Sequence, residues 1–138
     1  MQPATVGHLV YNINTKNTAF YKDLFVFLGL NVLYDVPEMI GVIDEHGVSL
    51  WLGAAPKEVS TTNDYDGPGL NHLGLSVKAI ADVDAAVDIL ADRGVTALFE
   101  TPRHRPEFSA GPDQTYYQVM FESPDSILFE IVYTGPKE

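Results

Sequence analysis

The chain has 138 residues, of which 46% are hydrophobic, and a formal net charge of −11 at pH 7. This length is sufficient for one compact domain with a buried core. The acidic balance argues against a surface that binds the phosphate backbone of nucleic acids. The chain has no cysteine, which excludes disulfides, thiolate metal ligands and cysteine nucleophiles within it.

Residues 1–5 show no signal-peptide pattern, and no stretch approaches the roughly 20 apolar residues of a membrane span. We therefore expect a cytoplasmic protein without a membrane partner.

The first half of the chain predicts a β-α-β-β-β unit, module one, over about 6–53. Its first strand, 6–13, alternates in polarity and places His8 opposite Leu9 and Tyr11. A helix follows from about Asn17 to Leu28 and ends at Gly29. The apolar residues that recur at helical spacing are Phe20, Leu24, Phe27 and Leu28, and three strands are then expected at about 31–35, 39–44 and 48–53.

Residues 54–69 are rich in Pro, Gly, Ser, Thr and Asn, which predicts a linker. Module two then repeats the pattern over about 70–133. His72 opens a strand to Val77, and a helix from about Asp82 to Asp92 ends before Gly94. A loop over 101–114 has no counterpart in module one, and two strands at 115–122 and 127–133 complete the repeat.

The repetition extends to single positions. His72 follows His8 by nearly the same interval as Gly94 follows Gly29. One module cannot cover both faces of its own small sheet, so the two are expected to pair with pseudo-symmetry.

Two histidines at matching positions and one carboxylate suggest a metal site. Glu130 lies between apolar residues on the last strand, where an ionised group is costly unless it is paired or bound to a metal. His8, His72 and Glu130 would together suit a divalent ion with open coordination positions. The alternative is a set of hydrogen-bonded structural residues. His46 is interpreted as a surface residue, and His104 is left unassigned.

The tandem modules, each opened by a histidine, resemble the vicinal oxygen chelate superfamily, which includes glyoxalase I, extradiol dioxygenases and bleomycin-resistance proteins. Residues 119–132 are similar to its strand-turn-strand signature, with Ser123 and Ser126 at the outer turn positions. The resemblance covers almost the whole chain. It implies one α+β domain over 1–138, in which two βαβββ modules form a cup-shaped, incompletely closed eight-stranded mixed β-barrel with the helices outside. It also implies that His8, His72 and Glu130 are the metal ligands.

Trp51 is a departure from glyoxalase I within this resemblance. Glyoxalase I has a further glutamate ligand in the last strand of its first module, and Trp51 aligns there with Glu130 of the second module. Because an indole cannot ligate a metal in this way, glyoxalase I activity itself is disfavoured. Trp51 could form a wall of the ligand pocket or simply fill the core.

Further ligand-binding candidates lie in module two. Arg103 and Arg105 could meet an anionic substrate or could be solvated loop charges. Gln118 should face the interior of the cup. Tyr116 and Tyr117 point to opposite faces, and one of their hydroxyls is a candidate donor or proton shuttle. The substrate-binding candidates are Trp51, Arg103, Arg105, Gln118 and Tyr117.

Three functions remain open. The first is an enzyme that uses Fe, Mn, Ni, Co or Zn and acts on a small oxygenated substrate as a lyase, an isomerase or a ring-cleaving dioxygenase. The second is a non-catalytic protein that binds a small molecule or antibiotic, as bleomycin-resistance proteins do. The third is a domain whose histidines are structural. The resemblance also makes a homodimer plausible.

Overall fold

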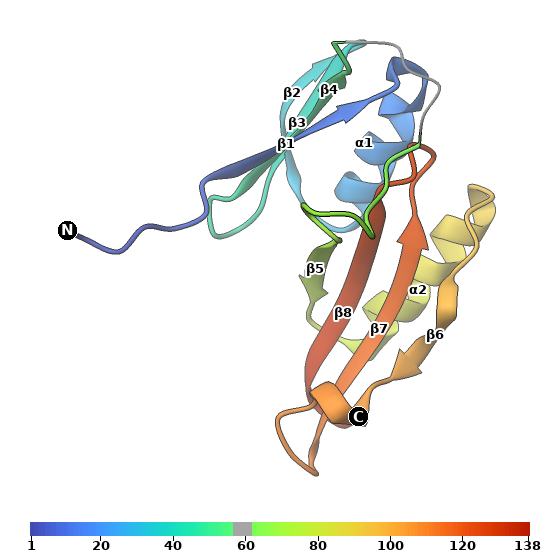
Figure 1. The fold of residues 1–138 in the computed structure, drawn as a ribbon. Helices are drawn as coiled ribbons and strands as arrows, with labels where there is room; N and C mark the ends of the chain where they lie inside the picture. Colours follow the sequence, from blue (N-terminus) through green and yellow to red (C-terminus); the bar gives the residue numbers. More distant parts are fainter. Residues whose placement is uncertain (57–61) are drawn as a thin grey trace. The chain divides into compact units, whose positions relative to one another are not determined.

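The computed structural model describes residues 1–56 and 62–138. The chain divides into two compact units, Met1–Thr61 and Thr62–Glu138, and the boundary falls inside the predicted linker. Each unit consists of a four-stranded sheet and one α-helix (Figure 1). No helix in the described part of the chain is long and apolar enough to cross a membrane.

The two units share one topology, which confirms the predicted βαβββ order in both modules. The strand order is β1-β4-β3-β2 in the first unit and β5-β8-β7-β6 in the second, with a parallel first pair and antiparallel pairs after it. The first unit contains β1 (His8–Ile13), the 3-10 helix η1 (Thr15–Asn17), α1 (Thr18–Phe27), β2 (Asn31–Val36), β3 (Met39–Ile43) and β4 (Ser49–Ala54). The second contains β5 (Leu73–Val77), α2 (Ile80–Asp92), β6 (Leu98–His104), the 3-10 helix η2 (Pro106–Phe108), β7 (Gln114–Glu122) and β8 (Leu128–Pro136).

Strand register relates the two modules residue by residue. In the first module, Val10 of β1 lies opposite Trp51 of β4. In the second, Gly74 of β5 lies opposite Glu130 of β8. Val10 follows His8 by two residues, just as Gly74 follows His72. Trp51 and Glu130 therefore occupy equivalent positions, in agreement with their alignment in sequence.

In the second module, alternate residues of β7 and β8 face in opposite directions. Val119, Phe121, Phe129 and Ile131 are fully buried, and α2 packs against these two strands. The rings of Phe121 and Phe129 stack with their centroids 5.6 Å apart. The intervening residues, including Gln118 and Glu130, point to the opposite face of the sheet, which carries the candidate site.

The buried face of α1 differs from the predicted one. Thr18, Tyr21, Leu24 and Phe25 are buried, whereas Phe27 is 43% exposed. Only Leu24 belongs to both sets. The stretch 20–28 is apolar nearly all round, so its periodicity did not fix which stripe would meet the sheet. The stop at Gly29 is as predicted: its φ is +85°, and the Leu30 N–H donates to the Phe25 carbonyl oxygen.

The prediction of a loop over 101–114 is wrong at its start, because β6 continues to His104. The register shifts between Leu98 and Arg103, where two residues with positive φ lie. The Thr101 hydroxyl bridges this irregularity: it accepts from the Met120 N–H (3.0 Å) and donates to the Leu98 carbonyl oxygen (2.6 Å). After this bulge β6 pairs with β7 again, and Arg103 lies opposite Gln118.

Gly41 allows the Trp51 ring to lie against β3. A Cβ atom at Gly41 would be 2.5 Å from Trp51 Cζ3, whereas one at Gly7 would meet nothing within 4 Å. We expect Gly41→Ala to lower the free energy of unfolding by about 1–3 kcal/mol through overpacking. Gly7→Ala should change it by less than about 0.5 kcal/mol. Urea unfolding checks both, and equal stability of the two variants would contradict this packing.

Candidate functional site

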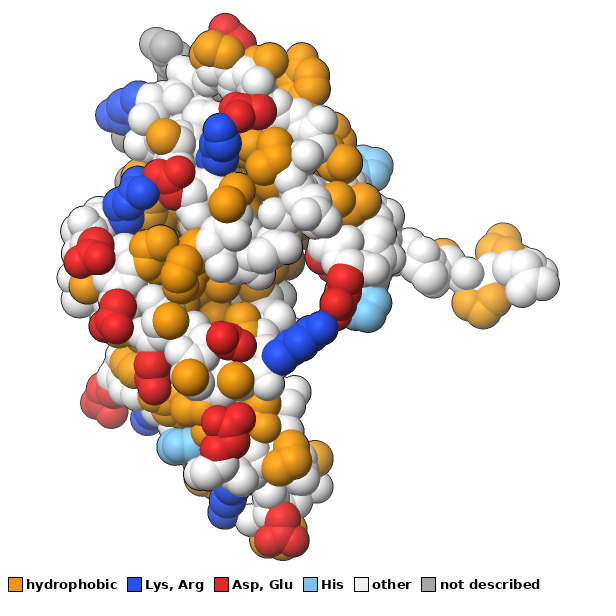
Figure 2. Space-filling model, turned by 180° about the vertical axis from the view of Figure 1, so that it is seen from behind, with side chains coloured by type: hydrophobic (Ala, Val, Ile, Leu, Met, Phe, Trp, Pro, Cys, Tyr) orange, Lys and Arg blue, Asp and Glu red, His pale blue; other side chains and the backbone are white. Residues whose placement is uncertain are grey.

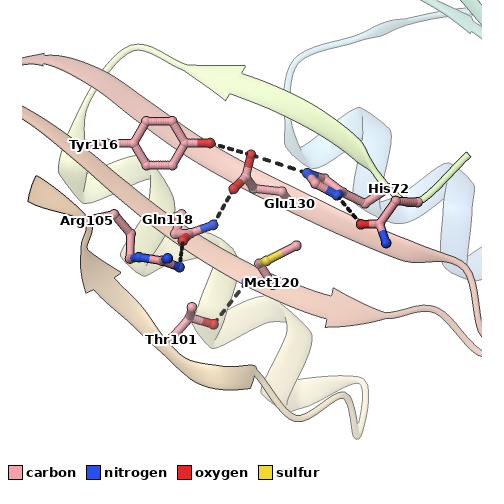
Figure 3. A network of polar contacts seen from close by, with 8 residues as sticks. His72, Thr101, Arg105, Tyr116, Gln118, Met120 and Glu130 are labelled. Atoms are coloured by element: carbon pink, nitrogen blue, oxygen red, sulfur yellow. Dashed lines mark hydrogen bonds and ion pairs between the residues drawn. The ribbon is translucent and has the colours of Figure 1, made fainter. Parts of the chain in front are cut away.

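The centre of the candidate site is the buried carboxylate of Glu130, which is 5% exposed. The Tyr116 hydroxyl donates to its Oε1 at 2.8 Å, and the Gln118 side-chain amide donates to its Oε2. Both donors come from β7, beside Glu130 on the sheet face opposite α2 (Figure 3). These hydrogen bonds offset part of the cost of removing a carboxylate from water.

His72 lies beside this carboxylate. Its Nε2 is 4.0 Å from Glu130 Oε1, which is beyond the length of a direct hydrogen bond. Its Nδ1 lies 2.7 Å from Asn71 Oδ1. The imidazole ring is therefore held on one side and directed toward Glu130 on the other.

Asn71 determines which nitrogen of His72 carries the proton. The Asn71 amide nitrogen donates to the Tyr65 carbonyl oxygen at 3.0 Å. A carbonyl can only accept, so the amide oxygen of Asn71 must face His72 Nδ1, which must donate to it. In a neutral imidazole this leaves Nε2 unprotonated, with its lone pair toward Glu130.

The segment before β5 is anchored to module two, although its first residues were interpreted as part of a linker. The Tyr65 hydroxyl donates to the Glu122 carboxylate, and the Asn63 amide donates to the Ser126 carbonyl oxygen at 3.2 Å. These contacts hold Asn71 in place. Sequence reasoning missed the roles of Tyr65 and Asn71 because no local pattern marks such contacts.

Gly74 leaves space next to the carboxylate. It lies directly opposite Glu130 across the parallel pair of β5 and β8. A Cβ atom at Gly74 would be 3.2 Å from Glu130 Oε1, closer than most real Cβ contacts. Any side chain larger than that of glycine at this position would therefore crowd Oε1 from the β5 side.

Arginine side chains extend the polar network toward β6. Arg105 Nη1 donates to Gln118 Oε1 at 3.0 Å, so the Gln118 amide connects Arg105 to Glu130 (Figure 3). Arg105 Nε also bonds to Glu107 at 2.5 Å, and its guanidinium lies 4.6 Å from the centre of the Phe108 ring. This guanidinium is thereby held in a defined position.

The structure brings five of the predicted residues to one sheet face of module two and leaves Tyr117 out. The Tyr117 hydroxyl donates to Asp84 of α2 at 2.7 Å, and its ring packs 4.6 Å from that of His104. Tyr117 thus lies on the helix-covered face, and its neighbour Tyr116 reaches Glu130 instead. The five residues on the candidate face are His72, Arg103, Arg105, Gln118 and Glu130.

The other two predicted site residues belong to module one. His8 is exposed at the start of β1. Trp51 is half-buried, donates its indole N–H to Ser49 Oγ at 3.0 Å, and lies 6.2 Å from the Tyr34 ring. Within either unit, no three His, Asp or Glu side chains of the described residues form a group that could hold a metal ion. His46 is exposed, as its turn predicts.

Comparison with known proteins identifies the family. The sequence model of the Glyoxalase/Bleomycin resistance protein/Dioxygenase superfamily matches residues 6–131. The chain therefore belongs to this superfamily, as its sequence resemblance implied.

Solved structures share the fold. A candidate glyoxalase from Bacillus halodurans is 25% identical, with a TM-score of 0.74 over 93% of this chain and 94% of that one. A glyoxalase/bleomycin resistance protein/dioxygenase domain from Frankia sp. EAN1pec is 20% identical, with a TM-score of 0.66 over 100% and 94%. A glyoxalase/bleomycin resistance protein from Albidiferax ferrireducens T118 is 16% identical, with a TM-score of 0.70 over 92% and 97%. No curated protein matches the sequence significantly.

Tyr116 should remain protonated well into the alkaline range. Burial, followed by the hydrogen bond to Glu130, raises its pKa to about 12. An unfolded tyrosine ionises near pH 10, so between about pH 10 and 12 only the unfolded state loses this proton. The contribution of Tyr116 to stability is therefore present below about pH 10 and is lost as the pH rises to 12. The pKa values of Tyr11, Tyr65 and Tyr117 are also raised to about 12, by burial or by hydrogen bonds to carboxylates. Ultraviolet titration of tyrosinate should therefore show a late phase that Tyr116→Phe reduces by one tyrosine, and an identical titration would contradict this assignment.

Proposed function

We propose that this protein binds a divalent metal ion through His72 and Glu130 and presents it to a small oxygenated ligand. The observation that carries this proposal is the position of His72 Nε2 4.0 Å from Glu130 Oε1, while Nδ1 of the same ring is bound to Asn71 Oδ1. Two electron-pair donors so placed favour a cation between them. Imidazole and carboxylate are suitable ligands for several first-row metal ions.

The groups behind the two ligands support this proposal. Histidine ligands usually donate their second ring N–H to an oxygen acceptor, and ligating carboxylates are usually hydrogen-bonded. Asn71 accepts from His72, and Tyr116 and Gln118 donate to Glu130. The donor set and its supporting groups therefore fit a metal site.

His8 is the proposed third ligand, on the basis of its matching position in the sequence repeat. Fe, Mn, Ni, Co and Zn are all compatible with a site of two imidazoles and one carboxylate. The equivalent of Glu130 in module one is Trp51, so no glutamate is present there to act as a further ligand. This difference argues against glyoxalase I activity itself.

We propose an enzyme of the lyase, isomerase or ring-cleaving dioxygenase type. A bound metal would supply Lewis acidity to two neighbouring oxygens of the substrate. Gln118 fixes the orientation of the Glu130 carboxylate. Tyr116, with its pKa raised to about 12, acts at neutral pH as a hydrogen-bond donor and not as a base.

Metal content after removal of each ligand tests the site. We expect about one metal ion per wild-type chain, and at least about tenfold weaker binding in Glu130→Gln and His72→Ala. The measurements are elemental analysis and titration of chelator-treated protein with each candidate ion. His46→Ala, which removes an exposed histidine, is the matched control and should bind like the wild type.

The same titration separates the ligands. His8→Ala should weaken binding as His72→Ala does if His8 is the third ligand; unchanged binding would remove His8 from the site. A wild-type protein that takes up none of the five metals would overturn the proposal.

Asn71 provides a separate test through the tautomer of His72. Asn71→Leu removes the acceptor for Nδ1 and should weaken metal binding by about 10–100-fold, whereas Asn71→Asp retains an acceptor and should bind more tightly than Asn71→Leu. Nitrogen NMR of the metal-free protein should show the proton of His72 on Nδ1 in the wild type and a mixture of tautomers in Asn71→Leu. A proton found on Nε2 in the wild type would contradict the assigned geometry.

A second candidate function is ligand binding without turnover. The observation that favours it is the position of Trp51, which is the module-one equivalent of Glu130. Its ring lies against Gly41 and near Tyr34, so module one presents aromatic groups where module two has a carboxylate. Trp51 is the only tryptophan, so quenching of its fluorescence reports a ligand near module one. Binding without product formation would favour this candidate, and catalytic turnover would exclude it.

A further inference from the structure

The Arg103 guanidinium is only loosely paired within the described part of the chain. Its Nε atom is buried and has no hydrogen-bond acceptor among those residues. The Glu100 carboxylate is 3.7 Å from Nη1 and 90% exposed, so this is a loose surface ion pair. The Arg103 side chain itself is 41% exposed, which leaves part of the guanidinium open to a ligand.

Arg103 and Arg105 lie on the sheet face that carries Glu130. Arg103 is opposite Gln118 in the pairing of β6 with β7, and Arg105 donates to the same glutamine. In the whole chain, 8 basic residues stand against 19 acidic ones, and acidic side chains are scattered over the face drawn in Figure 2. Two of these few basic residues thus lie together beside one buried glutamine.

We propose that Arg103 and Arg105 form a subsite for a carboxylate group of the substrate. This inference rests on the proposed function, because the carboxylate would belong to the same molecule whose oxygens the metal binds. Guanidinium groups pair with planar carboxylates through two parallel charge-assisted hydrogen bonds. The exposed part of Arg103 provides donors for this pairing, and Arg105 adds positive charge next to it.

Local charge favours a singly charged group over a phosphate. Glu100 lies near Arg103, and Glu107 binds Arg105 at 2.5 Å. Each arginine is thereby partly neutralised, and the buried Glu130 adds another negative charge nearby. A monoanionic carboxylate fits this balance better than a doubly charged phosphate does.

An aromatic surface borders the subsite. The Phe108 ring is 55% exposed and meets Tyr116 edge-on with the ring centroids 5.5 Å apart. Arg105 packs against the Phe108 ring, and the Tyr116 hydroxyl donates a hydrogen bond to Glu130. The substrate class that this surface fits is a small carboxylic acid with an aromatic or apolar body and two adjacent oxygens.

Two probes that differ only in this charge test the subsite. 3,4-Dihydroxybenzoate and its methyl ester present the same adjacent oxygens, with and without the carboxylate. We expect metal-loaded wild-type protein to bind the acid at least about tenfold more tightly than the ester in calorimetric titrations. Arg103 is chosen for substitution because Arg105 also binds Gln118. Arg103→Gln should reduce the preference for the acid over the ester to near unity.

The controls distinguish this inference from the metal proposal. Arg93→Gln, at an exposed position after α2, should keep the preference, and Arg103→Gln should keep its metal content. Equal affinity for acid and ester, or a preference unchanged in Arg103→Gln, would overturn the subsite while leaving the metal site intact. A preference for inorganic phosphate over the acid as competitor would overturn the assignment to a carboxylate.

If the wild-type protein takes up no metal, the metal proposal fails first. The acid is then titrated into metal-free wild type and Arg103→Gln. Binding that Arg103→Gln abolishes would support the subsite on its own, and absence of binding would overturn it.

Discussion

A buried carboxylate on an otherwise apolar strand is the constraint around which the second module is arranged. Glu130 is 5% exposed and must be compensated by donors or a cation. Tyr116 and Gln118 supply donors from the adjacent strand, and Gly74 leaves room on the other side. The imidazole of His72 does not reach hydrogen-bonding distance of the carboxylate. The 4.0 Å between His72 Nε2 and Glu130 Oε1 leaves room for a cation bound to both, and this is the physical basis for proposing a metal ion.

The two modules use the same backbone position differently. Glu130 and Trp51 are equivalent by register, but the first has polar neighbours on its sheet and the second lies against the bare backbone of Gly41. Equivalent positions can differ in this way because the helix-covered face of each sheet forms the core. In both modules the core requires alternate strand residues to be apolar, and it places no such requirement on the residues between them. The site-bearing face of each sheet is then free to change its chemistry.

Positioning at the site depends on contacts between segments far apart in sequence. Tyr65 and Asn71 come from the stretch before β5, yet they fix the ring of His72. Arg105 at the end of β6 acts on Glu130 only through Gln118. Hydrogen bonds between neutral and charged groups in such a network strengthen one another where water is excluded. The functional side chains are thus held by a shared network and not by individual strands.

The sequence by itself determined the duplication and the order of the elements, and it singled out His72 and Glu130 as a pair, because alternation, glycine stops and repeat spacing are local signals. It did not determine which side of α1 is buried, because apolar residues surround that helix. It also did not show that β6 continues past the register shift to include Arg103. Only tertiary structure decided that Tyr116, and not Tyr117, reaches Glu130, and that Asn71 binds Nδ1 of His72. Those outcomes depend on strand register and on side chains that meet only after the chain has folded.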